Sequence, residues 1–290
     1  MGAWIANHNW LPVEAIVFLV LGSSCFYIAG MVLNDVVDVK RDTMERPSRP
    51  IPSGRVSRGA ALTAAIGLLV CGLIFSMVAA HRCHGFATAD FWRTTGLAGM
   101  LLACIVGYDW ILKQTLLAPI IMGTCRFLNI LLGCSMGIAK AGAIGGFEWN
   151  HLLIAGIVGL YICGITWFAR DEARESTKMN HYIGAALILL ALGSLHTLPY
   201  RFGIENPSRI FGCHIFLTLA TLFILWRIQK AIRTGKPVDF QTAIVMCLFS
   251  LIILDAFFVM LATPTEPQAA LFIAAMLLPS NIIGRFTRPT

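Results

Sequence analysis

Charged residues are scarce in this 290-residue chain, since only 13% are Asp, Glu, Lys or Arg, about half the ~25% typical of soluble domains. A globular protein of this length must present a polar surface to water, and so few charges cannot cover one. The same figures exclude a disordered chain, which combines high charge with low hydrophobicity. A polytopic membrane protein remains. The 57% of apolar residues suffices for roughly eight or nine crossings of about 20 residues each.

Signatures of other protein classes are also missing. No Gly-rich phosphate loop, haem motif or Ser-His-Asp arrangement stands out. Eight of the nine cysteines lie inside apolar segments, where they act as small hydrophobic residues, so no disulfide framework is indicated. Neither a linker nor an internal repeat is evident. We therefore expect residues 1–290 to form a single transmembrane domain.

Long apolar segments, each interrupted by charge or proline, follow one another along the chain. None alternates in polarity at every second residue, so we expect helices rather than barrel strands. The predicted fold is an all-α polytopic membrane protein with about nine transmembrane helices. They are expected near residues 11–33, 59–80, 95–112, 118–139, 150–169, 181–198, 210–228, 241–262 and 268–283, the last being short.

The distribution of basic residues predicts the orientation in the membrane. If the loop at 34–58 is cytoplasmic, nine crossings place 16 of the 22 basic residues inside and five outside, as the positive-inside rule requires. The net charge of +7 is then a signal of topology and implies no nucleic-acid partner. We expect a multi-pass protein of the cell membrane that contacts the lipid bilayer.

A cluster of acidic residues follows the first predicted helix. Asp35, Asp38 and Asp42 are spaced three and four residues apart, so a helix would place their carboxylates on one face, beside Asn34. Three like charges repel one another unless a cation joins them. Mg²⁺ favours oxygen ligands and often completes its shell with substrate phosphate. The spacing therefore predicts a magnesium and phosphate site, with an ordinary solvated loop as the alternative.

Two arginines come directly after these acids. Arg46 and Arg49 stand among Pro47, Pro50 and Pro52, which stiffen the segment, and a guanidinium binds phosphate oxygens in a bidentate manner. We therefore predict that Arg46 and Arg49 bind diphosphate.

The segment Asn34–Gly54 resembles the first aspartate-rich motif of the UbiA superfamily of intramembrane prenyltransferases, N-D-x-x-D-x-x-x-D followed by R-P-x-P-S-G. Later segments resemble the EboC branch most, and they lie at 112–115, 122–129 and 166–170. The resemblance implies a helical bundle with a central cavity open to the cytoplasmic side. It also implies that Mg²⁺, held by Asn34, Asp35, Asp38 and Asp42, binds a prenyl diphosphate there.

Lys113 matches the lysine of the superfamily that contacts diphosphate, although Gln114 follows it where arginine is usual. A lysine at a helix end could also simply extend toward water. By the resemblance, Asp35, Asp38 and Lys113 are the catalytic residues.

The resemblance also implies a second acidic motif after the helix at 150–169. Asp171 and Glu175 are four residues apart and could share a metal ion, whereas Ala169 and Ala173 stand where acids are expected. Arg170 could bind diphosphate or neutralise these acids. Because this segment departs from the second motif of the superfamily, a catalytically degenerate protein is an alternative.

Arg126 lies about eight residues inside a predicted helix, roughly 12 Å along its axis. Charges at such depth usually face a cavity or a partner. Asn129 shares its helix face, and both are predicted to bind diphosphate, with an ion pair between Arg126 and Asp255 as the alternative.

Together these features predict Mg²⁺-dependent transfer of a prenyl group to an unidentified small or lipid acceptor. The alternative is a degenerate relative that binds, transports or helps assemble an isoprenoid-linked metabolite. The first motif ends the first helix here but the second helix in the superfamily. We therefore expect the family's first helix to be missing at the N-terminus.

Overall fold

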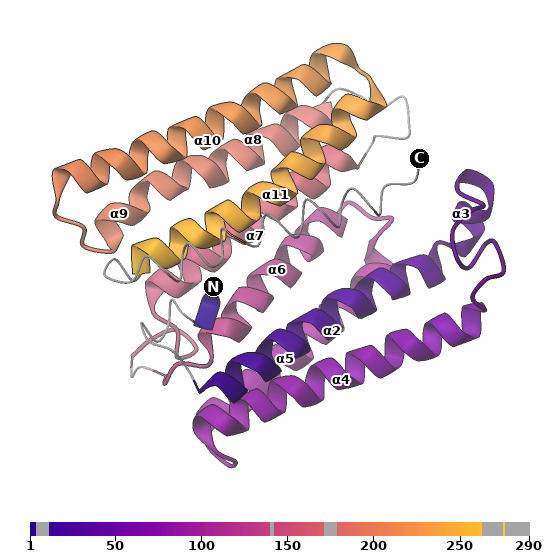
Figure 1. Ribbon diagram of the computed structural model, residues 1–290, viewed down its shortest axis with the longest axis horizontal. Coiled ribbons are helices and arrows are strands. Elements are labelled where there is room, and N and C mark those ends of the chain that lie inside the picture. The colour runs from indigo at the N-terminus through magenta and orange to yellow at the C-terminus, as the bar shows by residue number, and fades with distance from the viewer. Residues whose placement is uncertain (4–11, 140–141, 171–178, 263–274, 276–290) are drawn as a thin grey trace. The chain divides into compact units, whose positions relative to one another are not determined.

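The computed structural model describes residues 1–3, 12–139, 142–170, 179–262 and 275. These residues contain helices and no β-strand. They fall into two compact units, one formed mainly by residues up to 155 and the other by residues from 156 onward. Figure 1 shows the helices of both units. The expectation of a single domain stays a prediction.

The first unit is built from long helices joined by short turns. Its elements are α2 (Val13–Val37), α3 (Val39–Glu45), α4 (Arg58–His84), α5 (Ala89–Gly107), the π-helix η1 (Tyr108–Leu112) and α6 (Ala118–Cys134). Helix α7 (Trp149–Ala169) begins in this unit and continues into the next. The second unit adds α8 (Met179–Ser194), the 3₁₀-helix η2 (Leu195–Thr197), α9 (Leu198–Arg201), α10 (Pro207–Thr234) and α11 (Pro237–Ala262).

Seven helical stretches in the described residues are long and apolar enough to cross a membrane, and α6 is a shorter apolar helix. These eight coincide with the first eight predicted segments. The prediction of an all-α polytopic membrane protein is confirmed. The ninth predicted segment, at 268–283, lies almost entirely outside the described residues.

Side chains at the helix ends explain where several helices start. The hydroxyl of Ser57 accepts a hydrogen bond from the amide of Ala60 at the start of α4, and Thr88 does the same for Phe91 in α5. Asn206 caps α10 in this way, and Gly235 ends that helix in the left-handed conformation. Polar caps of this kind satisfy amides that have no partner within the helix.

Helices α2 and α4 pack closely through small residues. A Cβ atom at Gly72 of α4 would lie 2.8 Å from the ring of Phe26 in α2. A Cβ at Gly22 of α2 would lie 2.9 Å from the hydroxyl of Ser76 in α4. Small residues let helix backbones approach in a membrane, where packing replaces the hydrophobic effect. This packing holds α2, the helix that ends in the acidic cluster, against a second long helix.

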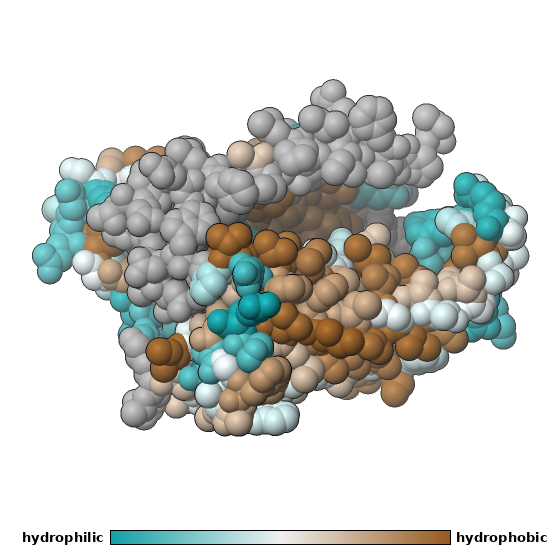
Figure 2. All heavy atoms as spheres, turned by 60° about the horizontal axis from the view of Figure 1, so that its bottom comes forward, coloured by the Kyte–Doolittle hydropathy of each residue, from teal (hydrophilic) through white to brown (hydrophobic). Residues whose placement is uncertain are grey.

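The opposite side of α4 is apolar and exposed. Ile66, Val70 and Ile74 recur at four-residue spacing and are about half exposed. Figure 2 shows hydrophobic side chains along the flank of the first unit, with hydrophilic ones gathered near α3 and the loop that follows it. A helix side of this composition suits contact with lipid.

The end of α6 furthest from η1 is fastened by α5. Arg93 donates hydrogen bonds to the carbonyl oxygens of Ser135 (3.1 Å) and Gly137 (2.5 Å), and its guanidinium also pairs with Asp90 at 3.1 Å. Carbonyls at a helix C-terminus lack helical partners, and a cation there is favourable. In the second unit, the hydroxyl of Tyr161 in α7 lies 2.8 Å from that of Ser250 in α11.

Replacing Gly72 with leucine should lower the free energy of unfolding by about 1–3 kcal/mol, the usual cost of overpacking a well-packed site. The new side chain would collide with Phe26, which is only 1% exposed and has little room to move. Thermal unfolding in detergent measures the effect.

The control is Gly67→Leu on the same helix, because no atom lies within 4 Å of a Cβ built there. Equal destabilisation by the two substitutions would contradict close packing of α2 on α4 at Gly72.

Candidate active site

The predicted acidic cluster lies where α2 passes into α3. Asn34 and Asp35 belong to the last turn of α2, Asp38 stands between the helices, and Asp42 lies on α3. Backbone hydrogen bonds continue across the junction, from the amide of Asp38 to Asn34 (3.0 Å) and from that of Asp42 to Asp38 (2.9 Å). The acids thus follow one nearly continuous helical path.

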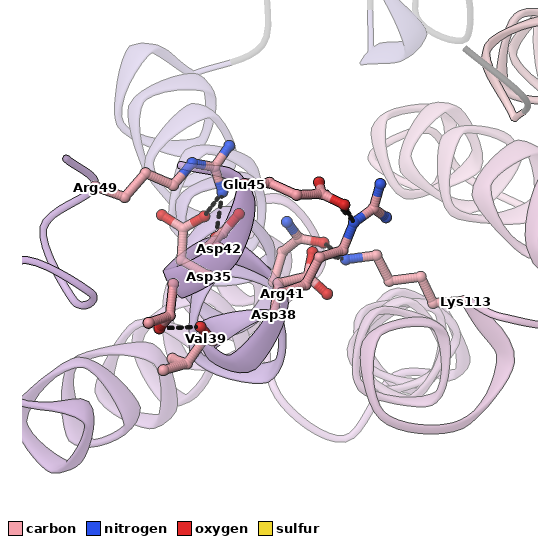
Figure 3. Close-up of polar contacts among 10 residues, drawn as sticks. Asp35, Asp38, Val39, Arg41, Asp42, Glu45, Arg49 and Lys113 are labelled. Atoms are coloured by element: carbon pink, nitrogen blue, oxygen red, sulfur yellow. Dashed lines mark hydrogen bonds and ion pairs between the residues drawn. The ribbon is translucent and has the colours of Figure 1, made fainter. Parts of the chain in front are cut away.

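The three carboxylates have two different cation partners. Asp35 and Asp42 point toward Arg49, whereas Asp38 points toward Lys113 (Figure 3). The one-residue break at Asp38 separates the two helices, and a different cation attracts the acid on each side. Lys113 thus joins Asp38 to Asn34, and the prediction that the three carboxylates hold one metal ion stays a prediction.

Arg49 bridges the first pair of acids. Its Nη1 atom lies 2.9 Å from Asp35 Oδ1 and 2.7 Å from Asp42 Oδ2. The side chain of Asp42 is only 7% exposed, so this carboxylate depends on Arg49 for its charge partner. Arg46 is exposed, and its side chain forms no ion pair with an acid among the described residues. Of the two predicted arginines, only Arg49 is thus placed against the acids.

Local hydrogen bonds shape the loop that carries Arg49. The amide of Arg49 donates a hydrogen bond to the carbonyl oxygen of Arg46 at 3.1 Å. The amide of Ser53 donates one to the carbonyl oxygen of Arg49 at 3.0 Å. Arg55 donates to the carbonyl of Ser48 at 2.6 Å. Gly54 has a φ of 76°, which favours glycine. The loop therefore folds back on itself and returns Arg49 to α2 and α3.

Lys113 approaches the cluster from η1. Its ammonium donates hydrogen bonds to Asn34 Oδ1 and Asp38 Oδ2. The amide of Lys113 bonds to the carbonyl of Tyr108 at 2.8 Å, five residues back, which closes the π-turn. Such turns insert one extra residue into a helix and often occur at functional sites. The structure thus brings the predicted lysine to two of the predicted metal ligands.

Sequence analysis missed one acidic residue at this place. Asp109 lies in η1 and is 3% exposed. It interacts electrostatically with both Lys113 and Asp38. Its position directly after Tyr108, inside an apolar segment, was a usable signal, because an intramembrane acid usually indicates a function.

Arg126 and Asn129 both lie on α6, at least two turns beyond its first residue. Asn129 Oδ1 accepts a hydrogen bond of 2.7 Å from the hydroxyl of Ser23 in α2. This partly buried contact joins α6 to α2. The predicted role of Arg126 and Asn129 in binding diphosphate stays a prediction.

The second predicted acidic motif follows α7 in the sequence. Asp171 and Glu175 lie outside the described residues, and Arg170, at the end of α7, belongs to the other compact unit. Their predicted roles stay predictions.

The first unit offers oxygen donors that suit magnesium. The three aspartate carboxylates and the amide oxygen of Asn34 are oxygen donors, and Mg²⁺ commonly binds one or two carboxylates together with substrate phosphates and water. Among the described residues no three His, Cys, Asp or Glu side chains gather closely enough to hold a metal alone. The donor set therefore fits Mg²⁺ that arrives with a diphosphate, which would supply the remaining ligands.

Comparison with known proteins identifies the chain. Its sequence matches the UbiA prenyltransferase family over residues 1–278. The chain belongs to the UbiA prenyltransferase family. The expected superfamily is thereby confirmed, and the EboC branch stays a prediction.

Relatives of the chain carry two different names, digeranylgeranylglyceryl phosphate synthase and 4-hydroxybenzoate octaprenyltransferase. The chain is 32% identical to the digeranylgeranylglyceryl phosphate synthase of Methanothermobacter thermautotrophicus, over 81% of its own length and 83% of the relative. It is 26% identical to the 4-hydroxybenzoate octaprenyltransferase of Legionella pneumophila, over 78% of its own length and 70% of the relative. With three other digeranylgeranylglyceryl phosphate synthases the shared part is 28% to 63% of the relative.

A solved structure of digeranylgeranylglyceryl phosphate synthase in membranes has the same fold. The TM-score is 0.63 at 17% identity, and 91% of each chain is covered. The likeness confirms the UbiA-type helical fold of this multi-pass membrane protein.

Replacing Arg49 with glutamine should lower the free energy of unfolding of the ligand-free protein by about 1–3 kcal/mol. The substitution leaves the buried Asp42 without its cation, and breaking such a pair is costly, although the partial exposure of Arg49 reduces the cost. Thermal unfolding in detergent at neutral pH measures the change.

Arg41→Gln is the matched control, because Arg41 pairs with Glu45 where both side chains are about half exposed. Exposed pairs contribute about 0–1 kcal/mol. If both variants lost the same stability, Arg49 would not be the required partner of Asp42.

Proposed function

We propose that this chain transfers a prenyl group from a prenyl diphosphate to a small or lipid acceptor, in a Mg²⁺-dependent reaction within the membrane. One observation carries the proposal: Arg49 and Lys113 meet the acidic end of α2 from two different segments. Acids and cations arranged in this way suit a metal-bound diphosphate. Membership in the UbiA family supports the same reaction.

The diphosphate is proposed to bind among Arg46, Arg49 and Lys113. Arg49 offers the planar guanidinium that matches phosphate oxygens, and Lys113 offers a point charge. Asn34, Asp35, Asp38 and Asp42 are the proposed metal ligands. When bound, Mg²⁺ neutralises charge on the departing pyrophosphate.

The reaction breaks the bond between C1 of the prenyl group and the bridging oxygen, and the electron pair leaves with pyrophosphate. The acceptor forms a new bond to C1 and loses a proton. Fixed positive groups stabilise the leaving charge only if they are in place beforehand. Arg49, held on two sides by Asp35 and Asp42, meets this condition. Apolar helices around the site would keep water from the allylic cation.

Further residues are assigned to the site by the same proposal. Arg126, Asn129 and Arg170 are proposed as additional diphosphate contacts, and Asp171 with Glu175 as a second pair of metal ligands. The site is proposed to open to the cytoplasmic side of the cell membrane through a central cavity, since the basic residues are concentrated in the loops assigned to that side.

The acceptor is the least specified part of the reaction. The names of the relatives imply two classes, a prenylated glyceryl phosphate and a hydroxybenzoate. A panel containing both classes, together with cyclic alcohols and sugar phosphates, covers the chemistry expected from the sequence.

Asp38→Asn should lower the rate of pyrophosphate release by at least roughly a hundredfold. Loss of a group that stabilises charge in the transition state has an effect of this size. Purified protein in lipid vesicles is given labelled geranylgeranyl or farnesyl diphosphate and the acceptor panel, with Mg²⁺ or with EDTA. Pyrophosphate and prenylated product are measured together.

Glu45→Gln is the control, because Glu45 on α3 is exposed and pairs with the exposed Arg41. Mg²⁺-dependent binding of the diphosphate without release, over the whole panel, would favour the degenerate carrier or assembly protein. Unchanged turnover in both Asp38→Asn and Arg49→Gln would overturn the proposed site.

A further inference from the structure

Asp109 is a buried carboxylate to which the proposed reaction assigns no role. It is 3% exposed, and no donor in the described part of the chain reaches its Oδ1 atom. A buried acceptor without a partner costs about 1–3 kcal/mol. A buried polar group without a partner calls for an explanation, and a role in function is one of those known.

Lys113 creates a conflict that such a group could resolve. Its ammonium donates hydrogen bonds to Asn34 Oδ1 and Asp38 Oδ2, and the proposed function assigns these two residues to the metal. A lysine ammonium and Mg²⁺ cannot both take these two atoms. The ammonium must therefore move before a metal can bind, and it needs a second anion nearby.

Within the described residues of the cluster, Asp109 is an acid near Lys113 that no cation pairs with. It precedes Lys113 by four residues in the same π-turn, and its charge acts on both Lys113 and Asp38. The other acids of the cluster, Asp35 and Asp42, are already bound to Arg49. The exchange of one carboxylate for the other requires rotation of the Lys113 side chain.

We propose that Asp109 is a positioning residue that receives the Lys113 ammonium when a divalent cation takes its place at Asn34 and Asp38. Lys113 is then held beside the diphosphate and no longer blocks the metal ligands. The inference rests on the proposed function for the identity of these ligands.

The test is Mn²⁺ binding, followed by the electron paramagnetic resonance signal of the free ion, in the whole protein without a prenyl substrate. Inorganic pyrophosphate is absent in one series and present in another. Asp109→Asn should weaken Mn²⁺ binding roughly tenfold, which is within the range of coupling between contacting groups. Without Asp109, the lysine stays on Asp38 and competes with the metal.

Lys113→Gln should strengthen Mn²⁺ binding, because the competing ammonium is gone. In the Lys113→Gln background, Asp109→Asn should change the affinity by less than about twofold, since Asp109 acts through the lysine. Asp109→Glu should restore most of the wild-type affinity. Because the amide of Asn has the same shape as the carboxylate of Asp, Asp109→Asn should preserve the packing. Thermal unfolding of each variant verifies that it is folded.

Equal weakening by Asp109→Asn in both backgrounds would overturn the inference, because Asp109 would then act directly on the metal. The absence of Mn²⁺ binding in all variants, with and without pyrophosphate, would overturn it as well. Mn²⁺ binding with the expected coupling but no pyrophosphate release would contradict only the proposed function. Turnover without coupling would contradict only the role of Asp109.

Discussion

The neutralisation of acids at the end of α2 is the interaction on which the site depends. The C-terminus of a helix carries partial negative charge, and Asn34, Asp35 and Asp38 add carboxylates or amide oxygens at that place. Such an end is unstable alone in an apolar surrounding. Arg49 and Lys113 supply the missing positive charge from a loop and from η1. The opposite charges therefore hold the neighbouring loop and the sequence-distant η1 against the end of α2.

Packing on the other side of α2 makes this convergence possible. Gly22 and Gly72 let α2 and α4 approach until side chains of one touch the backbone of the other. The hydrogen bond from Ser23 to Asn129 fastens α2 to α6, the helix that follows η1. Because α2 is held by both neighbours, its acidic end meets Lys113 at a definite position. Polar groups within the membrane thus serve first to position helices.

Hydropathy alone predicted the helices well, since a membrane demands long apolar segments with internally satisfied backbones. The segments predicted at 59–80 and 150–169 match α4 and α7 within a few residues. The acids, Arg49 and Lys113 were also found from the sequence. Their pairing was not, because two arginines with similar neighbours, Arg46 and Arg49, differ only in how the loop folds. Asp109 was missed because its burial is set by η1 and the helices packed on it.

The π-turn at Tyr108–Leu112 also affects how related chains should be aligned. A π-turn holds one residue more than the α-helical turn it replaces, so Tyr108 and Lys113 are separated by five positions in sequence yet joined by one backbone hydrogen bond. A relative with one residue fewer between its tyrosine and lysine could place the same two side chains with an ordinary helix. A single-residue gap here is then a change of helix type that leaves the site intact.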